Sequence, residues 1–236
     1  MNEEAKMKIY DREGAPHPAR VRIVVAEKRL EDRVEFISID LIAAEHKRSG
    51  FLAMNPIGKI PVLELDDGTI ISESTAITEY LDNLDGNPTL TGTNPREKGL
   101  IHMMQRRAEM MVIDAVDDYF HYGTPGLGGA LRPWRMPDWT GAKEWGRRRG
   151  DYAVHNLTYF DEVLTTQPYL AGDRFSMPDI TLYAGLMFAE LVGLPLAPRL
   201  AALHAWRGRV DALPAVRNRS GRDPVPEDLA RQPGSA

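Results

Sequence analysis

The sequence predicts an α/β domain followed by an all-helical domain, and three observations carry this prediction. Strand and helix signals alternate over residues 7–84. A cluster of turn-forming residues from Asp85-Gly86 to Asn94-Pro95 then interrupts the pattern and is typical of a linker. From residue 96 onward, apolar residues recur at helical spacing. We therefore expect a first domain over 7–84, a linker over 85–95, a helical domain over 96–219 and a mobile tail over 220–236.

The first domain has the expected order β-α-β-(α)-β-β-α. Runs rich in apolar and β-branched residues predict strands, apolar residues three or four apart predict helices, and Asp67-Gly68 is a hairpin turn signal. A short helix is expected to end before Pro56, because the residue before a proline is biased away from helix. The expected strands are 8–10, 34–41, 60–65 and 69–71, and the expected helices are 18–30, a short one ending at 51–54, and 74–84.

Four helices are expected in the second domain. Their predicted ranges are 101–122, 144–164, a helix that begins at Ser176, and 200–213. The start at Ser176 is well marked, because Asp179 follows at the position of the acid in a capping box and Pro178 lies in the first turn.

Composition excludes several classes of protein. The 236 residues include no cysteine, which excludes disulfides, thiolate nucleophiles and thiolate metal sites. A formal net charge of −5 disfavours a nucleic-acid binder. The longest apolar run is shorter than the about 20 residues that a membrane span needs, and no secretory signal is visible, so a soluble cytoplasmic protein is expected. The six histidines have no paired spacing, and no metal is expected.

Four sequence pieces resemble the glutathione S-transferase superfamily, in particular its bacterial-type cytosolic members. The resemblance extends from residue 7 to about 219. It implies a thioredoxin-like N-terminal domain, an all-α C-terminal domain, glutathione as co-substrate and a homodimer. The pieces are KIY at 8–10 with VRIVVAEK at 21–28, FLAMNPIGKIPVL at 51–63, ESTAITEYL at 73–81 and LAGDRFSMPDIT at 170–181.

The resemblance assigns partners to most charged or polar groups of glutathione. Glu73 and Ser74 lie where a strand turns into a helix, whose N-terminus favours an anion such as the γ-glutamyl carboxylate, and Glu73 suits the ammonium. The alternative is that these two residues only cap the helix. Ile60-Pro61 resembles the family's cis dipeptide, which exposes backbone groups to the peptide of glutathione.

The glycyl carboxylate of glutathione needs a cation. His46 and Lys59 stand where related classes have basic residues for this purpose. The alternative for both is an ordinary surface position, which is the commoner fate of these residue types. Lys59 directly precedes Ile60-Pro61, so both assignments place it at one cleft.

The residue that activates the thiol is the main departure from the family pattern. A free thiol has a pKa of about 8.5, so catalysis requires a group that favours the thiolate. Ala15 stands where relatives have a serine. His17, whose charge changes near neutral pH, and Tyr10 on the first strand are the candidate substitutes. Backbone N–H groups at the start of the following helix are the third possibility.

The leading hypothesis is a glutathione transferase that conjugates the thiolate to a small hydrophobic electrophile. Aromatic side chains at the end of the first long helix, Tyr119 and Tyr122, are expected to line the electrophile pocket; packing in the helical core is the alternative. Two other readings stay open. One is a glutathione-dependent disulfide reductase or β-etherase-like lyase, and the other is a non-catalytic interaction module of the same fold. The sequence does not identify the electrophile or the physiological role.

Overall fold

The computed structural model describes residues 6–124, 128, 131 and 139–221. Its N-terminal part is built on a four-stranded sheet of order β2-β1-β3-β4. The strands are β1 (Met7–Asp11), β2 (Val34–Ser38), β3 (Val62–Glu64) and β4 (Ile70–Ser72), each within or close to an expected range. β1 pairs parallel with β2 and antiparallel with β3, and β3 pairs antiparallel with β4. This mixed sheet is the thioredoxin-like arrangement that the resemblance implies.

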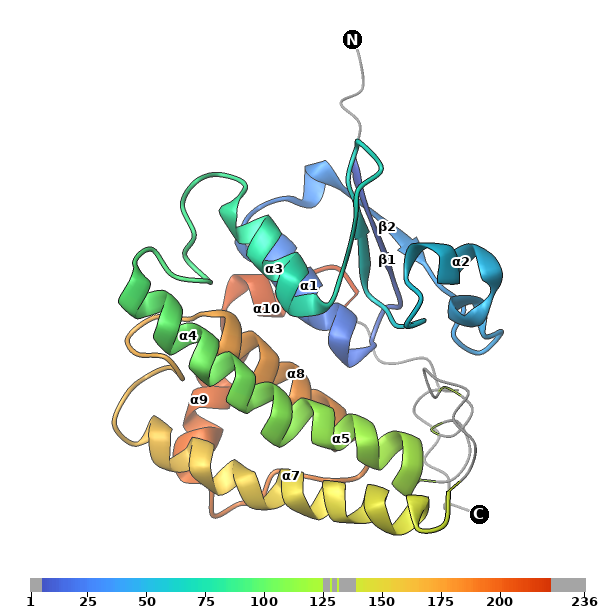
Figure 1. Ribbon diagram of the computed structural model, residues 1–236. Helices are drawn as coiled ribbons and strands as arrows, with labels where there is room; N and C mark the ends of the chain where they lie inside the picture. The colour runs from blue at the N-terminus through green and yellow to red at the C-terminus, as the bar shows by residue number, and fades with distance from the viewer. Residues whose placement is uncertain (1–5, 125–127, 129–130, 132–138, 222–236) are drawn as a thin grey trace.

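The two faces of the sheet are covered by different helices (Figure 1). Ile9 and Leu63 point to the face that α1 (Pro16–Glu27) and α3 (Ser74–Asn83) cover. The alternate residues Tyr10 and Val62 belong to a smaller cluster with Phe51 of α2 (Ser49–Met54) on the opposite face. Because successive side chains of a strand alternate between faces, this register directs Tyr10 away from α1.

One long helical run opens the C-terminal part. It comprises α4 (Pro95–Ala108), a π-turn (Glu109–Ile113), α5 (Asp114–Asp118) and a second π-turn (Tyr119–Gly123). It starts six residues before the expected range, because Asn94 caps it by accepting a hydrogen bond from the Glu97 N–H at 3.1 Å. The remaining helices are α7 (Ala142–Leu164), α8 (Met177–Leu191), α9 (Ala201–Asp211) and the short α10 (Pro214–Arg217).

α8 is the buried centre of the helical part, and Asp179 organises its start. The carboxylate of Asp179 accepts hydrogen bonds from the Leu170 N–H, the Trp206 indole and the N–H and hydroxyl of Ser176. The capping box expected at Ser176 is therefore present. Burial raises the pKa of Asp179 to about 6 even though these hydrogen bonds favour the carboxylate.

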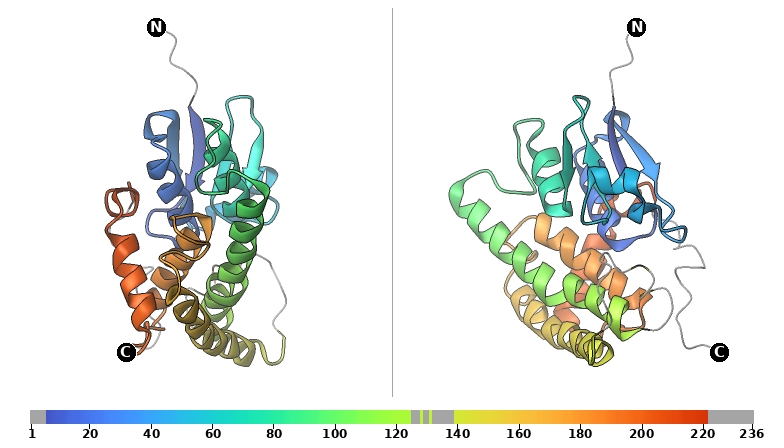
Figure 2. Two further views of the ribbon diagram at one scale, coloured as in Figure 1. Left: turned by 90° about the vertical axis from the view of Figure 1, so that its left-hand side faces the viewer. Right: turned by 45° about the vertical axis from the view of Figure 1, so that its right-hand side comes forward.

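The two parts pack directly on each other (Figures 1 and 2), mainly through α1 against α8 and α10. Arg22 of α1 forms a buried ion pair with Asp11, and its Nη1 donates to the Ser220 hydroxyl at 3.0 Å. The same guanidinium lies 3.9 Å from the centre of the Phe36 ring. The end of the described chain is thus attached to the first strand and first helix. The expected tail over 220–236 lies outside the described residues apart from positions 220 and 221.

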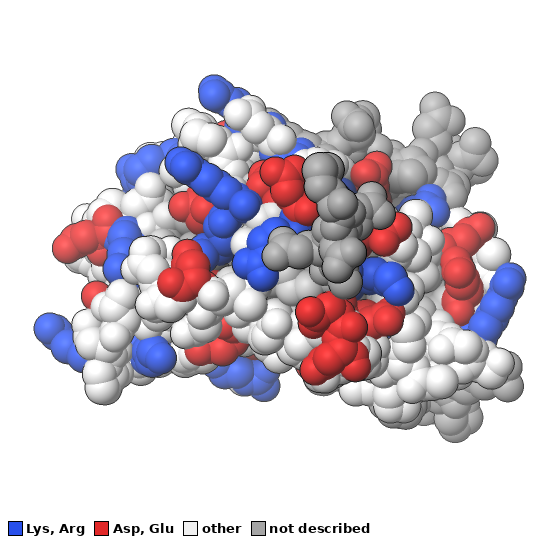
Figure 3. Space-filling model, turned by 90° about the horizontal axis from the view of Figure 1, so that it is seen from above, with Lys and Arg blue, Asp and Glu red and all other residues white. Residues whose placement is uncertain are grey.

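On the face that Figure 3 shows, basic side chains are intermingled with acidic ones rather than gathered in one stripe. Within the described residues, no helix is both long enough and apolar enough to cross a membrane.

Candidate functional site

Two adjoining cavities lie where the sheet domain meets the helical run. The first, which we name the α3 cavity, has a volume of about 280 Å³, and the second, the histidine cavity, about 120 Å³. They share His17, Lys59 and Ile60. The α3 cavity is also lined by Arg20, Asn55, Pro61, Glu73, Ser74, Thr75, Glu109 and Asp114. The histidine cavity is also lined by Pro16, Leu41, His46, Asp117, Phe120, His121, Phe188 and Leu191.

The N-terminus of α3 opens into the α3 cavity. Glu73 is its N-cap and has a φ of 71°, a conformation that residues with side chains rarely adopt. Such strain persists where the surroundings over-determine it, which is common at ligand sites. Ser74 follows, and its hydroxyl donates weakly to the His17 carbonyl at 3.4 Å. Both residues thus lie together at a helix end suited to an anion.

A buried ionic network forms the wall behind this helix end. One oxygen of Glu109 accepts hydrogen bonds from Arg20 at 3.0 Å, Thr75 at 2.5 Å and Gln105 at 2.9 Å. Burial raises the pKa of the Glu109 carboxyl, but Arg20 and the hydrogen bonds outweigh it and leave the pKa lowered. The network ties α1, α3 and α4 together beside Glu73 and Ser74.

Asn55 holds the loop that presents the cis Ile60-Pro61 bond. Its side-chain amide donates to the Lys59 carbonyl at 2.8 Å and accepts from the Ile57 N–H at 3.2 Å. The expected cis bond is present. The loop therefore brings Ile60, Pro61 and Lys59 to the cavities as one unit.

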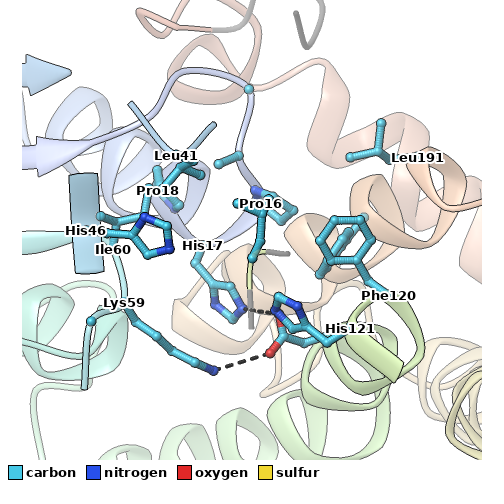
Figure 4. A pocket seen from close by; sticks show the side chains of 16 residues that line it. Pro16, His17, Pro18, Leu41, His46, Lys59, Ile60, Phe120, His121 and Leu191 are labelled. Carbon is cyan, nitrogen blue, oxygen red and sulfur yellow. Dashed lines mark hydrogen bonds and ion pairs between the residues drawn. The ribbon is translucent and has the colours of Figure 1, made fainter. Parts of the chain in front are cut away.

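Asp117 of α5 is the centre of the histidine cavity. One carboxylate oxygen lies 3.2 Å from Lys59 Nζ, and the other lies 3.4 Å from His121 Nε2 and 3.9 Å from His17 Nε2. Figure 4 shows Lys59, His17 and His121 gathered at this part of the cavity, and dashed lines from Lys59 and His17 mark two of these contacts. Burial disfavours the charged form, but the three basic partners outweigh it and hold the pKa of Asp117 well below its usual range. Burial likewise opposes the charge of Lys59, whose pKa Asp117 nevertheless raises.

His17 and His46 are neutral near pH 7. Burial lowers the pKa of each to about 4, and for His17 the opposing effect of Asp117 is smaller. Neither His17 Nε2 nor His46 Nδ1 has a hydrogen-bond partner within the described part of the chain. His46 can therefore offer a hydrogen bond to a carboxylate, whereas Lys59 supplies the positive charge.

Stability is expected to fall on acidification because of these histidines. The unfolded chain binds protons at pH values below about 6.5, whereas the folded chain resists protonation of His46 down to a pKa of about 4. The contribution of His46 is thus lost as the pH decreases from 6.5 to 4. We expect His46→Gln to lose less free energy of unfolding than wild type between pH 7 and 4.5, measured by urea titration. His155→Gln, at an exposed position, is the matched control; equal losses in all three proteins would contradict the prediction.

The loop before α1 contributes backbone rather than a hydroxyl. Ala15 is the N-cap, and its side chain has no acceptor. Of the first three helical residues only His17 carries an N–H, because Pro16 and Pro18 lack one. The Ala19 N–H donates to the Ala15 carbonyl at 3.0 Å and is occupied. His17 therefore offers a backbone N–H donor and an imidazole ring at this helix end.

Three predicted aromatic residues do not line either cavity. The Tyr10 hydroxyl donates to Glu64 at 2.5 Å, and this bond raises its pKa to about 12. The ring of Tyr119 packs against Gly150 of α7. Tyr122 lies near Trp139, with ring centroids 6.5 Å apart. The side chains of Tyr10, expected to activate the thiol, and of Tyr119 and Tyr122, expected to line the electrophile pocket, thus contact other parts of the protein than the two cavities.

Phe120 and His121 occupy the position expected for the tyrosines. Both lie in the second π-turn, where the extra residue per turn shifts the faces of the helix from regular 3.6-residue spacing. Phe120 packs edge-on against Phe188, with centroids 5.5 Å apart, and Leu191 continues this apolar wall. His121 Nδ1 lies 2.7 Å from the Gly128 carbonyl.

Within the described residues, no group of three or more potential metal-ligating side chains could hold a metal ion.

Comparisons with known proteins agree with this geometry. Residues 15–84 match the glutathione S-transferase N-terminal domain and residues 155–214 the glutathione S-transferase C-terminal domain. The chain is 53% identical to Glutathione S-transferase 2 of Saccharomyces cerevisiae over 90% of this chain and 88% of that protein. It is 28% identical to maleylacetoacetate isomerase of Pseudomonas aeruginosa over 85% and 86%, respectively.

Solved structures give the same result. The crystal structure of Gtt2 from Saccharomyces cerevisiae is similar with a TM-score of 0.84 and 52% identity, covering 89% of this chain and 99% of that one. A class Gtt2 glutathione S-transferase of Vibrio parahaemolyticus has a TM-score of 0.76 and 28% identity, with 92% and 98% covered. With both domains matched and a relative 53% identical over 90% of this chain, the chain belongs to the glutathione S-transferase family.

Proposed function

We propose that this protein binds glutathione across the two cavities and conjugates its thiolate to a small hydrophobic electrophile. The observation that carries the proposal is the line of Glu73-Ser74, cis Ile60-Pro61 and Lys59 along adjoining cavities. This order matches the order of groups in glutathione: an amino-acid end, a peptide and a terminal carboxylate. An apolar wall containing Phe120, Phe188 and Leu191 adjoins it.

At the amino-acid end, opposite charges have separate partners. The α3 N-terminus and Ser74 suit the γ-glutamyl carboxylate, and the buried Arg20 adds positive charge behind them. Glu73 and Asp114 suit the ammonium. The backbone of Ile60 suits the cysteinyl peptide, and Lys59 the glycyl carboxylate. His46 is the neutral hydrogen-bonding partner near that carboxylate.

The thiol is proposed to lie at the N-terminus of α1. There the His17 N–H and the helix dipole favour a negatively charged sulfur. The neutral His17 ring is the nearest candidate to accept the thiol proton, because its Nε2 lacks a hydrogen-bond partner within the described residues. The thiolate then attacks an electrophile held on the apolar wall. Tyr10 is a poor candidate because Glu64 already engages its hydroxyl.

Calorimetric titration with glutathione at pH 7 tests the proposal. Wild type is expected to bind in the micromolar to millimolar range, and Ser74→Ala to bind about fivefold more weakly, which corresponds to one hydrogen bond of about 1 kcal/mol. Ser38→Ala, at an exposed position at the end of β2, is the control and is expected to bind like wild type. Failure of the folded wild type to bind would favour a non-catalytic interaction module.

The second candidate function is a glutathione-dependent disulfide reductase or β-etherase-like lyase. The observation that favours it is Ala15 in place of the usual hydroxyl residue. Turnover of a disulfide together with inactivity toward aryl halides would support this candidate over conjugation.

We further propose that the protein is a cytoplasmic homodimer. Leu100, Met103 and Met110 are exposed apolar side chains on the helical run, between 39% and 41% accessible, and they suit contact with a second copy.

A further inference from the structure

A single carboxylate serves both ends of the histidine cavity. Asp117 Oδ2 pairs with Lys59, which the proposed function assigns to the glycyl carboxylate of glutathione. Asp117 Oδ1 faces the imidazoles of His17 and His121, at the end where the thiol is proposed to lie. The charge of this one side chain is thus divided between an anion-binding group and two proton-binding groups (Figure 4).

Binding of the glycyl carboxylate of glutathione to Lys59 changes how the charge of Asp117 is divided. Before the ligand binds, Asp117 neutralises the Lys59 ammonium; afterwards Asp117 and the ligand carboxylate share this ammonium. The more Lys59 interacts with the ligand, the less it neutralises Asp117. The uncompensated charge of Asp117 then acts on the imidazoles at 3.4 and 3.9 Å, and a nearby negative charge stabilises the protonated form of a histidine.

We propose that Asp117 couples binding of the glycyl carboxylate at Lys59 to ionisation of the glutathione thiol. This inference rests on the proposed function. The S–H bond breaks, and its proton forms an N–H bond at His17 Nε2, in the tautomer that initially carries its proton on Nδ1. The imidazolium is then balanced by Asp117 and the sulfur keeps the electron pair. With an aryl halide, the thiolate forms a C–S bond, the C–halogen bond breaks, the halide leaves into solvent with its electron pair, and the proton passes from His17 to water. The glycyl carboxylate therefore contributes to turnover as well as to affinity.

The other charged groups near Asp117 leave this coupling intact. Asp114, one turn earlier on α5, has its pKa raised by burial and by the neighbouring Glu109 and Asp117. Arg20, on α1, is engaged by Glu109. Arg149 of α7 binds Asp118, the next residue, at 2.8 Å rather than Asp117. Among the residues that the structure describes, Lys59, His17 and His121 are therefore the basic groups that pair with Asp117.

The experiment compares glutathione with its glycyl ethyl ester, in which only the glycyl carboxylate charge is removed. Thiolate absorbance of the saturated protein is titrated against pH, and kcat is measured with an aryl halide. In wild type the bound thiol of the ester is expected to have a pKa roughly one unit higher than that of glutathione. The kcat with the ester is expected to be roughly tenfold lower than with glutathione at pH values below the thiol pKa of either bound ligand. The reason is that one pKa unit is a tenfold change in the thiolate fraction.

The variants separate coupling from simple loss of affinity. In Asp117→Asn, both ligands are expected to have the same thiol pKa and the same kcat. Asp118→Asn is the matched control, because Asp118 precedes the same π-turn but pairs with Arg149, and it is expected to keep the wild-type difference. Lys59→Met is expected to remove the difference and Lys59→Arg to retain it, which provides a second test should Asp117→Asn fold poorly.

Three outcomes would overturn the inference in distinguishable ways. Equal thiol pKa values for the two ligands in wild type would show that the glycyl carboxylate does not influence the thiol. A difference that persists in Asp117→Asn would show that the influence passes through another group. Binding of neither ligand to folded wild type would refute the proposed function itself.

Discussion

Replacing Glu109 with glutamine is expected to lower the free energy of unfolding by about 3 kcal/mol, because it leaves the Arg20 guanidinium buried without its counter-charge. Arg20 is 4% exposed and Glu109 19%, so little water reaches either group. For a chain of this size, such a loss lowers Tm by roughly 6–12 °C. Thermal unfolding monitored by circular dichroism measures it. Glutathione affinity is expected to fall as well, because the hydrogen bond that positions Thr75 and the start of α3 weakens when its acceptor is a neutral amide oxygen rather than a carboxylate.

The matched control for this prediction is Glu190→Gln. Glu190 also pairs with an arginine, Arg207, but it is 47% exposed, and surface ion pairs contribute about 0–1 kcal/mol. Replacing both Arg20 and Glu109 with methionine removes the charges together and is expected to restore part of the stability but not glutathione binding. Equal small effects of Glu109→Gln and Glu190→Gln would show that Arg20 does not depend on Glu109.

Replacing Asp179 with alanine is expected to lower the free energy of unfolding by about 4 kcal/mol. The substitution removes the acceptor of the Leu170 N–H, the Ser176 N–H and the Trp206 indole at once. Each buried donor left unsatisfied costs about 1–3 kcal/mol. Because Asp179 joins the loop before α8, the start of α8 and α9, the loss affects the whole helical part. Urea unfolding measures the change, with the fraction of soluble protein recorded alongside it.

Milder substitutions keep this second prediction testable should Asp179→Ala not fold. Trp206→Phe removes one donor while preserving an aromatic ring, and Ser176→Ala removes one hydroxyl. Each is expected to cost about 1–2 kcal/mol. Thr165→Ala, which removes an exposed hydroxyl bonded within its own turn, is the control. Losses at Trp206 and Ser176 no larger than at Thr165 would contradict a central role for Asp179.

Local signals predicted most of the fold. The capping residues of α8 lie three positions apart, so the start of that helix is visible in a short stretch of sequence. The strands and α3 are likewise encoded by nearby apolar patterns and by the Asp67-Gly68 turn. The start of α4 lies earlier than the apolar spacing predicts, because the first turn after Asn94 has polar residues at most positions and no apolar periodicity to mark it.

The candidate site was predictable where a motif is contiguous and not where distant segments meet. Ile60-Pro61 and Glu73-Ser74 are two separate motifs, each contiguous in the sequence, and both line the α3 cavity. Asp117 gave no local signal, because its partners Lys59 and His17 lie in other elements and only folding brings them together. An aromatic residue type at the end of the helical run predicts an apolar pocket but not which ring faces it, because the two π-helical turns after Ala108 change the angular position of each residue.

The contact between Arg22 and Ser220 has a consequence for synthesis of the chain on the ribosome. These residues are separated by 198 positions, so the sheet domain emerges long before the segment that covers Arg22. Until then the side of Arg22 that Ser220 contacts stays uncovered, and at an earlier stage of synthesis α8, which also packs on α1, is not yet made either. The N-terminal domain therefore completes its surface only when the last helices arrive, and a nascent chain stalled before α8 exposes an apolar face that chaperones recognise.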